Sequence, residues 1–532
     1  MRSVLSAIVI AVSATLVSAQ DSGTDIDGPF TRDELRSSIN LDDLLADAQT
    51  LEGFAYSTPE RNRVFGSPGH NATVNWLYDE LSSLNGYYSV SLQPFEALFS
   101  SGNESFTVNG ADQNATLLTY TPSGTALNTT IIAISNLGCN ASDYPSTVSG
   151  KIALVSRGSC TFGLKSALAG SAGAAGLVIY NNVPGPLAGT LGDASNPVGP
   201  YTPTVGIPLE NGQAILALLN SSSTPLAGNL EVNSILENRT TYNVLAQSNS
   251  GNQNSVLSLG GHTDSVIQGP GINDDGSGVI GLLNVARSLA SYSPLPSTYN
   301  SIRFAFWSAE EFGLLGSTYY VENLPAPELA KIKLYLNFDM IASPNYIYAL
   351  YDGDGSSFNL TGPPGSDRIE ALFQEYFSSN NLNYTASAFD GRSDYLPFIE
   401  AGVAAGGIFT GAEGIKTPAD VESFGGTAGL AYDENYHEAG DNVTNLNAEA
   451  FRVNSEAIAW SVATFLESLE GIPERNATQG GNGTASAVPK RKRSKRDVEW
   501  RKRAAGQSGF GNGNAHSHAH GKGGCAKFRV AI

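Results

Sequence analysis

The residues best suited to chemistry gather around one glycine-rich stretch, VLSLGGHTDSVIQGPGINDD, at positions 256–275. A short apolar run leads directly to His262 and Asp264, and Asp274 follows inside a turn rich in Gly, Asn and Asp. An imidazole and a carboxylate held at a strand end, where glycines let the backbone approach closely, are what a metal site requires. We therefore expect His262 and Asp274 to begin a metal centre that later residues complete.

Further candidate ligands follow later apolar runs. Glu310 and Glu311 come after IRFAFW, Asp339 closes LYLNFD, and His437 lies in AYDENYHEAGD after a glycine-rich loop. Taken singly, each is more simply explained as a structural or solvated residue. Two His and three carboxylates that converge on one edge are hard to explain by accident, and they suit two zinc ions that share one carboxylate. Neighbouring side chains in extended backbone point in different directions, so one of the two Glu residues can bind metal while the other acts as a base.

The elements that must position these residues alternate between strand and helix from about residue 239. Strands are predicted at 256–260, 302–307 and 334–339, and helices at 276–291, 315–321, 369–377 and 451–466. Two helices, from Leu41 and over 72–84, and a strand over 88–95 precede them, and His70 just before the second helix is interpreted as structural. This alternation predicts an α/β fold with a mostly parallel sheet covered by helices. In such sheets the ligand crevice lies beyond the carboxyl ends of the strands, which would bring the distant candidates together.

Length and composition indicate a globular protein of two or three domains. The chain has 532 residues, of which 41% are hydrophobic and 15% charged, and its net charge is -20. From Lys490 onward there are 12 basic and 2 acidic residues, a net of +10, so the preceding residues carry -30. So acidic a body argues against nucleic-acid binding.

Both ends of the chain have the character of processing segments. Residues 1–19 are predicted to be a secretory signal peptide, residues 20–35 a removable segment, and residues 473–532 a basic, disordered or processed tail. No later apolar run reaches the roughly 20 residues that a membrane helix needs. The expected location is extracellular, with the vacuolar lumen as the alternative. Glycosylation is predicted at Asn71, Asn103, Asn114, Asn128, Asn140, Asn220, Asn238, Asn359, Asn383 and Asn442.

Residues 126–238 differ in composition from the rest and are rich in Gly, Ala, Ser, Val and Pro. Residues 150–181 read as strand, turn, small-residue helix and strand, and this region resembles the protease-associated domain inserted in several secreted and vacuolar peptidases. We interpret it as a lid or substrate-access module. It divides the other predicted domain, which carries the candidate metal ligands, into 36–125 and 239–472. Cys139 and Cys160 in this region are expected to pair, while Cys525 is left over.

The motifs HTDSV, GPGINDDGSG, SAEEFGLLGS, NFDM, DGRSDYLPF, GGIFTGAEG and AYDENYHEAGDN occur in the order, and nearly the spacing, of the secreted or vacuolar double-zinc aminopeptidases. The resemblance covers about residues 36–470 and implies the zinc-exopeptidase fold. It implies that Asp274 bridges the zinc ions, with His262 and Asp339 on one and Glu311 and His437 on the other. Glu310 would be the general base that passes a proton from the attacking water to the leaving amine.

The same resemblance implies further roles. Asp264 would orient His262 through its other ring nitrogen, Tyr436 would stabilise the oxyanion, Asp390 and Arg392 would help to hold the substrate's α-amine, and Phe409 would line the pocket for the first side chain. Bacterial relatives have cysteines at the positions of Asn435 and Gly440, so this loop must be held by packing and hydrogen bonds. Relatives often have His at the position of Tyr395, which is given no catalytic role. The run 352–355, DGDG, hints at a calcium loop, but Pro363 stands where that loop needs Glu.

The implied activity is that of a monomeric zinc exopeptidase acting on peptides with a free N-terminus and preferring apolar residues such as leucine. Three alternatives remain open: a glutaminyl cyclase of the same fold with a single zinc, a related carboxypeptidase, and a non-catalytic receptor ectodomain. The ectodomain should lack metal ligands, and the inserted domain argues against the cyclase.

Overall fold

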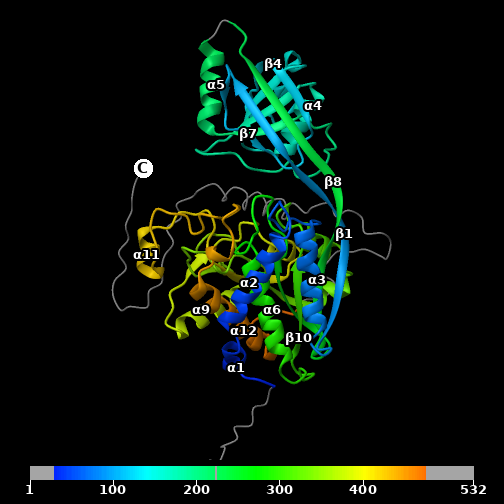
Figure 1. Ribbon diagram of the computed structural model, residues 1–532, viewed down its shortest axis with the longest axis vertical. Helices are drawn as coiled ribbons and strands as arrows, with labels where there is room; N and C mark the ends of the chain where they lie inside the picture. The colour runs from blue at the N-terminus through cyan, green and yellow to red at the C-terminus, as the bar shows by residue number, and fades with distance from the viewer. Residues whose placement is uncertain (1–28, 222–223, 475–532) are drawn as a thin grey trace, which may run out of the picture.

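The computed structural model describes residues 29–221 and 224–474. The predicted signal peptide, the tail beyond residue 474 and Cys525 lie outside these residues. The chain forms a larger and a smaller lobe, joined by two long strands, β1 (Tyr88–Val108) and β8 (Ala227–Ser248) (Figure 1).

One mixed sheet forms the centre of the larger lobe. Besides β1 and β8, its strands are β9 (Asn252–His262), β10 (Asn300–Trp307), β11 (Ile332–Phe338), β12 (Ala349–Tyr351), β13 (Thr385–Ser387) and β14 (Ala404–Phe409). They run in the order β13-β12-β14-β11-β9-β10-β8, with β1 paired to β8. The four strands from β14 to β10 are parallel to one another, and β13 is parallel to β12. Strand β12 is antiparallel to β14, and β8 is antiparallel to β10 and β1. This confirms the predicted mostly parallel α/β sheet.

Helices cover both faces of this sheet. The larger core packs against one face of the sheet, together with a group of helices that includes α6 and α12 (Figure 1). The helices of this group are α1 (Arg32–Ser37), α2 (Leu41–Ala55), α3 (Pro68–Ser82), α6 (Gly276–Ala290), α9 (Ser366–Ser379) and α12 (Ala448–Glu467). A second core packs against the other face with α7 (Leu315–Asn323), α8 (Ala326–Lys331) and α10 (Tyr395–Glu400). The short helix α11 (Pro418–Phe424) belongs to the loop after β14.

Two features of the N-terminal part go beyond what the sequence predicted. Phe30 and Leu35 are buried in the larger core, so the folded lobe includes residues from the segment that was expected to be removable. Helix α3 begins at Pro68, because Ser67 caps it by accepting a hydrogen bond from the His70 backbone N–H (3.2 Å). His70 therefore lies within the helix, fully buried, and its Nε2 is 2.9 Å from Thr263 Oγ1. This fits the structural interpretation of His70.

Strands β1 and β8 pair with each other from one lobe to the other. The antiparallel register runs unbroken from Tyr88 opposite Ser248 to Val108 opposite Gly228. The sequence predicted only residues 88–95 of β1, since alternation is regular there and weaker beyond. One ribbon contributes Tyr88 to the core of the larger lobe and Phe106 to a core of the smaller lobe. The inserted region is thus attached by a continuous backbone ladder.

The smaller lobe is a second α/β unit. It contains β2 (Ala111–Asp112), β3 (Thr116–Leu117), β4 (Gly124–Ala133), β5 (Ile152–Ser156), α4 (Phe162–Ser171), β6 (Gly176–Tyr180), β7 (Thr204–Ile207) and α5 (Leu209–Ser221). Phe106, Val108, Leu118 and Tyr120 pack into its cores, so the lobe also draws on residues before 126. The predicted pairing of the two cysteines in this region is confirmed by a disulfide between Cys139 and Cys160, with Cα atoms 5.8 Å apart.

The lobes also meet next to the candidate site. The Tyr120 hydroxyl donates a hydrogen bond to the Phe312 carbonyl (3.0 Å), and Phe312 directly follows Glu311. The Phe312 ring packs edge-on against Phe65, with ring centroids 4.8 Å apart. The smaller lobe therefore contacts the loop that carries two candidate site residues.

Among the described residues, no helix is long and apolar enough to cross a membrane.

Candidate metal centre

The candidate ligands lie where three neighbouring strands end. His262 is the last residue of β9, Asp339 directly follows β11, and Glu310 and Glu311 come three and four residues after the end of β10. Because β11, β9 and β10 are adjacent and parallel, their carboxyl ends form one edge. The structure confirms the prediction that topology brings these residues together.

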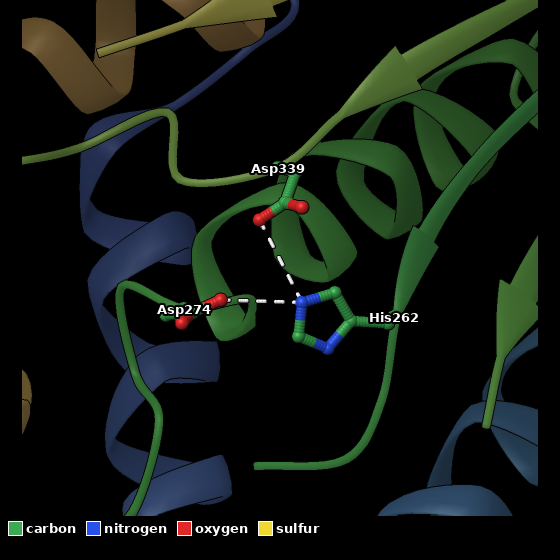
Figure 2. A group of neighbouring side chains, drawn as sticks. All are labelled: His262, Asp274 and Asp339. Carbon is green, nitrogen blue, oxygen red and sulfur yellow. Dashed lines mark ion pairs between the residues drawn. The ribbon is translucent and has the colours of Figure 1, made fainter. Parts of the chain in front are cut away.

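The side chains form two groups of three that share Asp274. One group is His262, Asp274 and Asp339 (Figure 2), and the other is Asp274, Glu311 and His437. His262 Nε2 lies 3.2 Å from Asp274 Oδ1 and 3.6 Å from Asp339 Oδ1. His437 Nε2 lies 3.2 Å from Asp274 Oδ2 and 3.1 Å from Glu311 Oε2. Asp274 thus presents one carboxylate oxygen to each imidazole.

These donors fit zinc. Each group offers one imidazole and two carboxylates, which are common zinc ligands, and three protein ligands leave a position open. Glu311 Oε1 is buried without a hydrogen-bond partner, and His437 Nε2 faces its two carboxylates without hydrogen-bond geometry. Buried polar atoms normally have partners, so these two atoms indicate that a cation belongs between the side chains.

Asp275, next to Asp274, links three backbone segments around the candidate site. One of its carboxylate oxygens accepts a hydrogen bond from the His262 N–H (3.0 Å). The other accepts from the Gly278 N–H (2.9 Å), which caps α6, and from the Met340 N–H (3.2 Å). A single buried carboxylate therefore fixes the end of β9, the start of α6 and the residue after Asp339. The sequence shows this residue only as part of a turn.

A second carboxylate holds the shared ligand. Asp441 accepts hydrogen bonds from the Asn273 N–H (2.9 Å) and the Asp274 N–H (3.0 Å), about 170 residues away in sequence. Burial, together with the charge of Asp433, raises the pKa of Asp441 to about 8. Asn445 donates to both Asp433 and Asp441, which links them. The backbone of the shared ligand is therefore fixed before any metal binds.

The fully buried Arg63 was missed by the sequence interpretation. Its guanidinium donates to the carbonyls of Thr263, Pro270 and Gly271, the last two in the loop that leads to Asp274. Its backbone N–H also donates to Ser265 Oγ (2.8 Å). A guanidinium presents donors on three separate nitrogens in one plane, whereas a lysine ammonium has its three donors on a single nitrogen. Nothing local marks Arg63, because all its partners lie about 200 residues further along the chain.

We expect Arg63→Lys to lower the free energy of unfolding by about 2–4 kcal/mol, since Lys cannot serve all three carbonyls and leaves at least one buried and unpaired. Chemical denaturation followed by circular dichroism measures this loss. Arg61→Lys is the matched control, because Arg61 is exposed and stacks over Tyr56 at 4.0 Å. Equal stability of the two variants would contradict the role given to Arg63.

Ser393 was likewise missed. Its hydroxyl donates to Asp339 Oδ2 and accepts a hydrogen bond from Asn337 Nδ2 (2.8 Å). Asn337 Oδ1 in turn accepts from the Tyr335 hydroxyl (3.2 Å), and Tyr335 accepts from Trp307 Nε1 (2.8 Å). This buried chain of hydrogen bonds fixes the orientation of Asp339 across β11 and β10.

Asp264 lies on the far side of His262 from the two groups of ligands. His262 Nδ1 is 3.1 Å from the Asp264 backbone oxygen and 3.8 Å from its carboxylate Oδ1. The same Oδ1 accepts a hydrogen bond from the Glu310 N–H (3.0 Å). Asp264 therefore orients the ring through its main chain, and its carboxylate holds the backbone of Glu310. Burial raises the pKa of Asp264 to about 7.

Three residues at the site have left-handed backbone. Ala309 before Glu310, Met340 after Asp339 and His437 itself have φ values of 60°, 53° and 60°. Each such conformation costs of the order of 1 kcal/mol or more in a non-glycine residue, and persists only where surrounding contacts enforce it. Here the strained turns direct the side chains of Glu310, Asp339 and His437 into one cleft.

Glu310, the candidate base, lines the cleft beside His262. Its Oε2 lies 3.9 Å from His262 Nε2, and only 8% of the residue is exposed. Burial raises the pKa of Glu310 well above its ordinary value; the His262 imidazole opposes this rise, and the charges of Asp394 and Glu311 add to it. A carboxyl group with a raised pKa can both accept and return a proton near neutral pH.

The cleft extends from these groups to the predicted substrate residues, and Asp390, Arg392, Phe409 and Tyr436 all line it. Arg392 pairs with both carboxylate oxygens of Glu413 (2.8 and 3.1 Å) and donates to the Tyr436 hydroxyl (3.1 Å). Tyr436 in turn stacks on the His437 ring at 3.8 Å. The Arg392 guanidinium is thus hydrogen-bonded to both Tyr436 and Glu413.

Tyr395, to which no role was given, organises the neighbouring turn. Its hydroxyl donates to Asp390 Oδ1 (3.0 Å) and accepts from the Gly391 N–H (2.8 Å). The ring is buried against Tyr351 and Phe389. Tyr395 therefore fixes the carboxylate of Asp390 at the cleft wall.

The loop that carries His437 is held by hydrogen bonds, as predicted from its lack of cysteines. Asn435 Nδ2 donates to Asn445 Oδ1 (2.7 Å), and the Asn435 N–H donates to Asp433 Oδ1 (2.9 Å). A Cβ atom on Gly440 would lie 2.0 Å from Asn435 Oδ1, so a larger residue there would force the Asn435 side chain to move. Asn435 and Gly440, at the positions of the two absent cysteines, pack directly against each other.

Comparison with known proteins extends these observations. The family model described as peptidase family M28 matches residues 243–462, and that of the PA domain matches residues 125–215. The probable leucine aminopeptidase 2 of Aspergillus fumigatus is 52% identical over 465 residues, which cover 87% of this chain and 91% of that protein. Leucine aminopeptidase 2 of Trichophyton rubrum is 47% identical over 481 residues, covering 90% and 95%.

Among solved structures, the aminopeptidase from Aneurinibacillus sp. strain AM-1 superposes with a TM-score of 0.65 at 24% identity, covering 81% of this chain and 95% of that one. A zinc aminopeptidase from Bacillus subtilis gives a TM-score of 0.56 at 22% identity, covering 84% and 98%. These likenesses agree with the observed fold. With the extensive identity to the fungal proteins, they show that the chain belongs to peptidase family M28, among its aminopeptidases, and carries an inserted PA domain.

Proposed function

We propose that this metallo-aminopeptidase removes apolar residues such as leucine from the N-termini of peptides, and that it holds two zinc ions. One observation carries the zinc proposal: Asp274 directs its two oxygens to two separate groups, each with its own imidazole and second carboxylate. His262 and Asp339 would complete one site, and Glu311 and His437 the other. The fungal relatives named leucine aminopeptidase 2 support the choice of substrate.

Bound zinc lowers the pKa of a coordinated water and polarises a carbonyl group. The chain supplies the proton transfer. Glu310 lies beside His262 and would accept a proton from the attacking water, then deliver it to the nitrogen of the leaving amine. Its backbone is fixed by Asp264, so the carboxyl group is aligned before substrate enters.

Tyr436 would donate its hydroxyl hydrogen to the oxygen that gains charge as the carbonyl is attacked. The Arg392 guanidinium beside it favours this, because a donor that already receives a hydrogen bond from a cation is a stronger donor. The Tyr436 ring stacks on the His437 ring, so the position of Tyr436 depends on the loop that carries this candidate ligand. Position and polarity therefore both depend on neighbours that the structure describes.

The free α-amine of the substrate is a cation at neutral pH, and a carboxylate is its natural partner. Asp390 offers one at the cleft wall, whereas Arg392 has the wrong charge for direct contact and contributes through Tyr436 and Glu413. The first side chain of the substrate would lie against Met340, Phe409 and Ala412, which also line the cleft. A pocket with these apolar residues fits leucine better than a charged side chain.

N-terminal blocking tests the orientation of the substrate. We expect Leu-Gly-Gly to be hydrolysed, and its N-acetylated form to lose at least about 100-fold in kcat/KM, since the acetyl group removes the charge that Asp390 would bind and adds bulk beside it. Amidation of the C-terminus should change the rate by less than about threefold. Liquid chromatography of the products reads out both rates. The reverse pattern would overturn the proposal in favour of a carboxypeptidase.

For location, we propose secretion, with the vacuolar lumen as the alternative. The apolar N-terminal run, the Cys139–Cys160 disulfide and the sequons support it. Nine of the ten predicted glycosylation sites are exposed, and Asn442 is partly buried. The smaller lobe would limit access to the cleft, because it contacts the Phe312 loop next to Glu311.

A further inference from the structure

A third group of acidic side chains lies behind the wall of the cleft and takes no part in the chemistry above. Asp352 follows β12, Asp354 comes two residues later, and Glu370 lies on α9. One carboxylate oxygen from each lies within 4.8 Å of the other two. The sequence DGDG at 352–355 lacks a Glu at the twelfth position of a calcium loop, but folding brings Glu370 to the same two aspartates from a helix.

Asp352 is the observation that indicates a ligand. The residue is fully buried, and its Oδ2 accepts hydrogen bonds from the backbone N–H groups of Ser357 (3.0 Å) and Phe358 (2.8 Å). Its Oδ1 is buried without any hydrogen-bond partner. Burying a carboxylate oxygen without a partner costs free energy of folding. A cation bound beside Asp352 Oδ1 would remove this cost.

Glu370 is 7% exposed and is aligned by the loop itself. Its Oε2 accepts hydrogen bonds from the N–H groups of Gly353 (2.8 Å) and Asp354 (3.2 Å), and its Oε1 accepts from Gln374 Nε2 (2.8 Å). No Cβ would fit at Gly353, since it would lie 2.2 Å from the Ser366 carbonyl. The loop and the helix start are therefore packed tightly enough to hold the three carboxylates together.

These negative charges have no positive partner in the part of the chain that the structure describes, since no ion pair there involves Asp352, Asp354 or Glu370. Burial, together with the charges of Asp354 and Asp352, raises the pKa of Glu370 to about 7. Burial also raises the pKa of Asp352. Two buried acids beside a third are costly to ionise unless a cation is bound between them.

We infer that Asp352, Asp354 and Glu370 bind a divalent cation of the calcium type. The donors are all carboxylate oxygens, with neither imidazole nor thiolate, which disfavours zinc. Calcium accepts six to eight oxygens in flexible geometry, so exposed Asp354 leaves room for water to complete the shell. Oxygens on opposite sides of a calcium ion are roughly 5 Å apart, in keeping with the spread of these donors.

Such an ion would stiffen one wall of the substrate cleft. The Asp352 N–H donates to the Ser387 carbonyl (2.8 Å), and Ser387 and Tyr351 both line the cleft. Tyr351 stacks on Phe389 with ring centroids 5.1 Å apart and an interplanar angle of 8°. Because Tyr351 is the last residue of β12, fixing Asp352 also fixes the position of the stacked Tyr351 and Phe389 rings. The expected consequences are higher thermal stability and a lower KM, with little change in kcat.

The test uses the full, zinc-loaded protein after passage over a chelating resin, with metal analysis to verify that zinc is retained. Isothermal titration with CaCl2 should give one site per chain, and Tm should rise by about 2–6 °C at saturating calcium. MgCl2 in a parallel titration should bind at least tenfold more weakly, because magnesium sheds its water reluctantly. Absence of a calcium response at millimolar concentration, or equal binding of magnesium, would overturn the inference.

Variants locate the ion. Asp354→Asn, at an exposed position that tolerates the change, should weaken calcium binding at least tenfold and abolish the rise in Tm, with zinc content unchanged. Glu370→Gln should do the same where it folds. Asp367→Asn is the matched control, because Asp367 is exposed, lies on α9 with Glu370 and carries the same charge as Asp354. Wild-type calcium affinity in Asp354→Asn would place the ion elsewhere and refute the assignment, whatever the outcome of the peptidase tests.

Discussion

Glu310→Gln is expected to keep its zinc and to lose about 10²–10⁴-fold in kcat on a leucine chromogenic amide. The amide has nearly the shape of the carboxylate but cannot accept a proton at neutral pH, so the attacking water loses its base. Metal content should hold, because Glu310 belongs to neither group of donors that shares Asp274. Steady-state kinetics together with zinc analysis of the purified variant test both parts.

Two comparisons sharpen this prediction. Glu311→Gln, one residue away, should bind less zinc, because Glu311 lies in the group with His437. Glu322→Gln, on the exposed face of α7, should match the wild type in both measurements. If Glu310→Gln kept most of its activity, or lost zinc as Glu311→Gln does, the base would have to be sought elsewhere.

Asp274→Ala is expected to reduce zinc from two equivalents per chain to well below one, and activity with it. The change removes one donor from each group and leaves only a single imidazole and a single carboxylate on either side. Two ligands hold zinc far more weakly than three. Inductively coupled plasma analysis after dialysis measures the metal, and circular dichroism verifies folding.

Asp339→Ala is the informative comparison, because Asp339 belongs to the His262 group alone. That variant should retain about one zinc through Asp274, Glu311 and His437. The order expected for zinc content is therefore wild type, then Asp339→Ala, then Asp274→Ala. If Asp274→Ala retained as much zinc as Asp339→Ala, Asp274 would not be shared between two ions.

Much of this site could be predicted because its residues follow strands with a strong apolar pattern. His262 and Asp339 stand directly at the ends of buried runs, and parallel strands end on one edge whatever their order in the sheet. The predicted helices over 276–291 and 451–466 agree with α6 and α12 because both are long and strongly apolar. Local pattern therefore predicted these elements and the strand ends at which the candidate ligands lie.

The supporting residues could not be predicted, since their partners lie far along the chain. Arg63 serves carbonyls near residue 270, Asp441 holds the backbone of Asp274, and Ser393 donates to Asp339. Arg, Asp and Ser are common in loops, and no sequence spacing distinguishes these three residues from other polar loop residues. The function of each is created by burial against a particular partner.

The lengths of β1 and β8 were also decided in three dimensions, as their far halves are stabilised by pairing with each other over both lobes. The acidic group behind the cleft shows the same division. By itself the sequence placed Asp352 and Asp354 in a DGDG run and argued against a calcium loop there, because Pro363 stands at the twelfth position. Only the packing of α9 against that run supplied Glu370 as the third carboxylate, because contacts between distant segments depend on tertiary packing, which local propensity does not record.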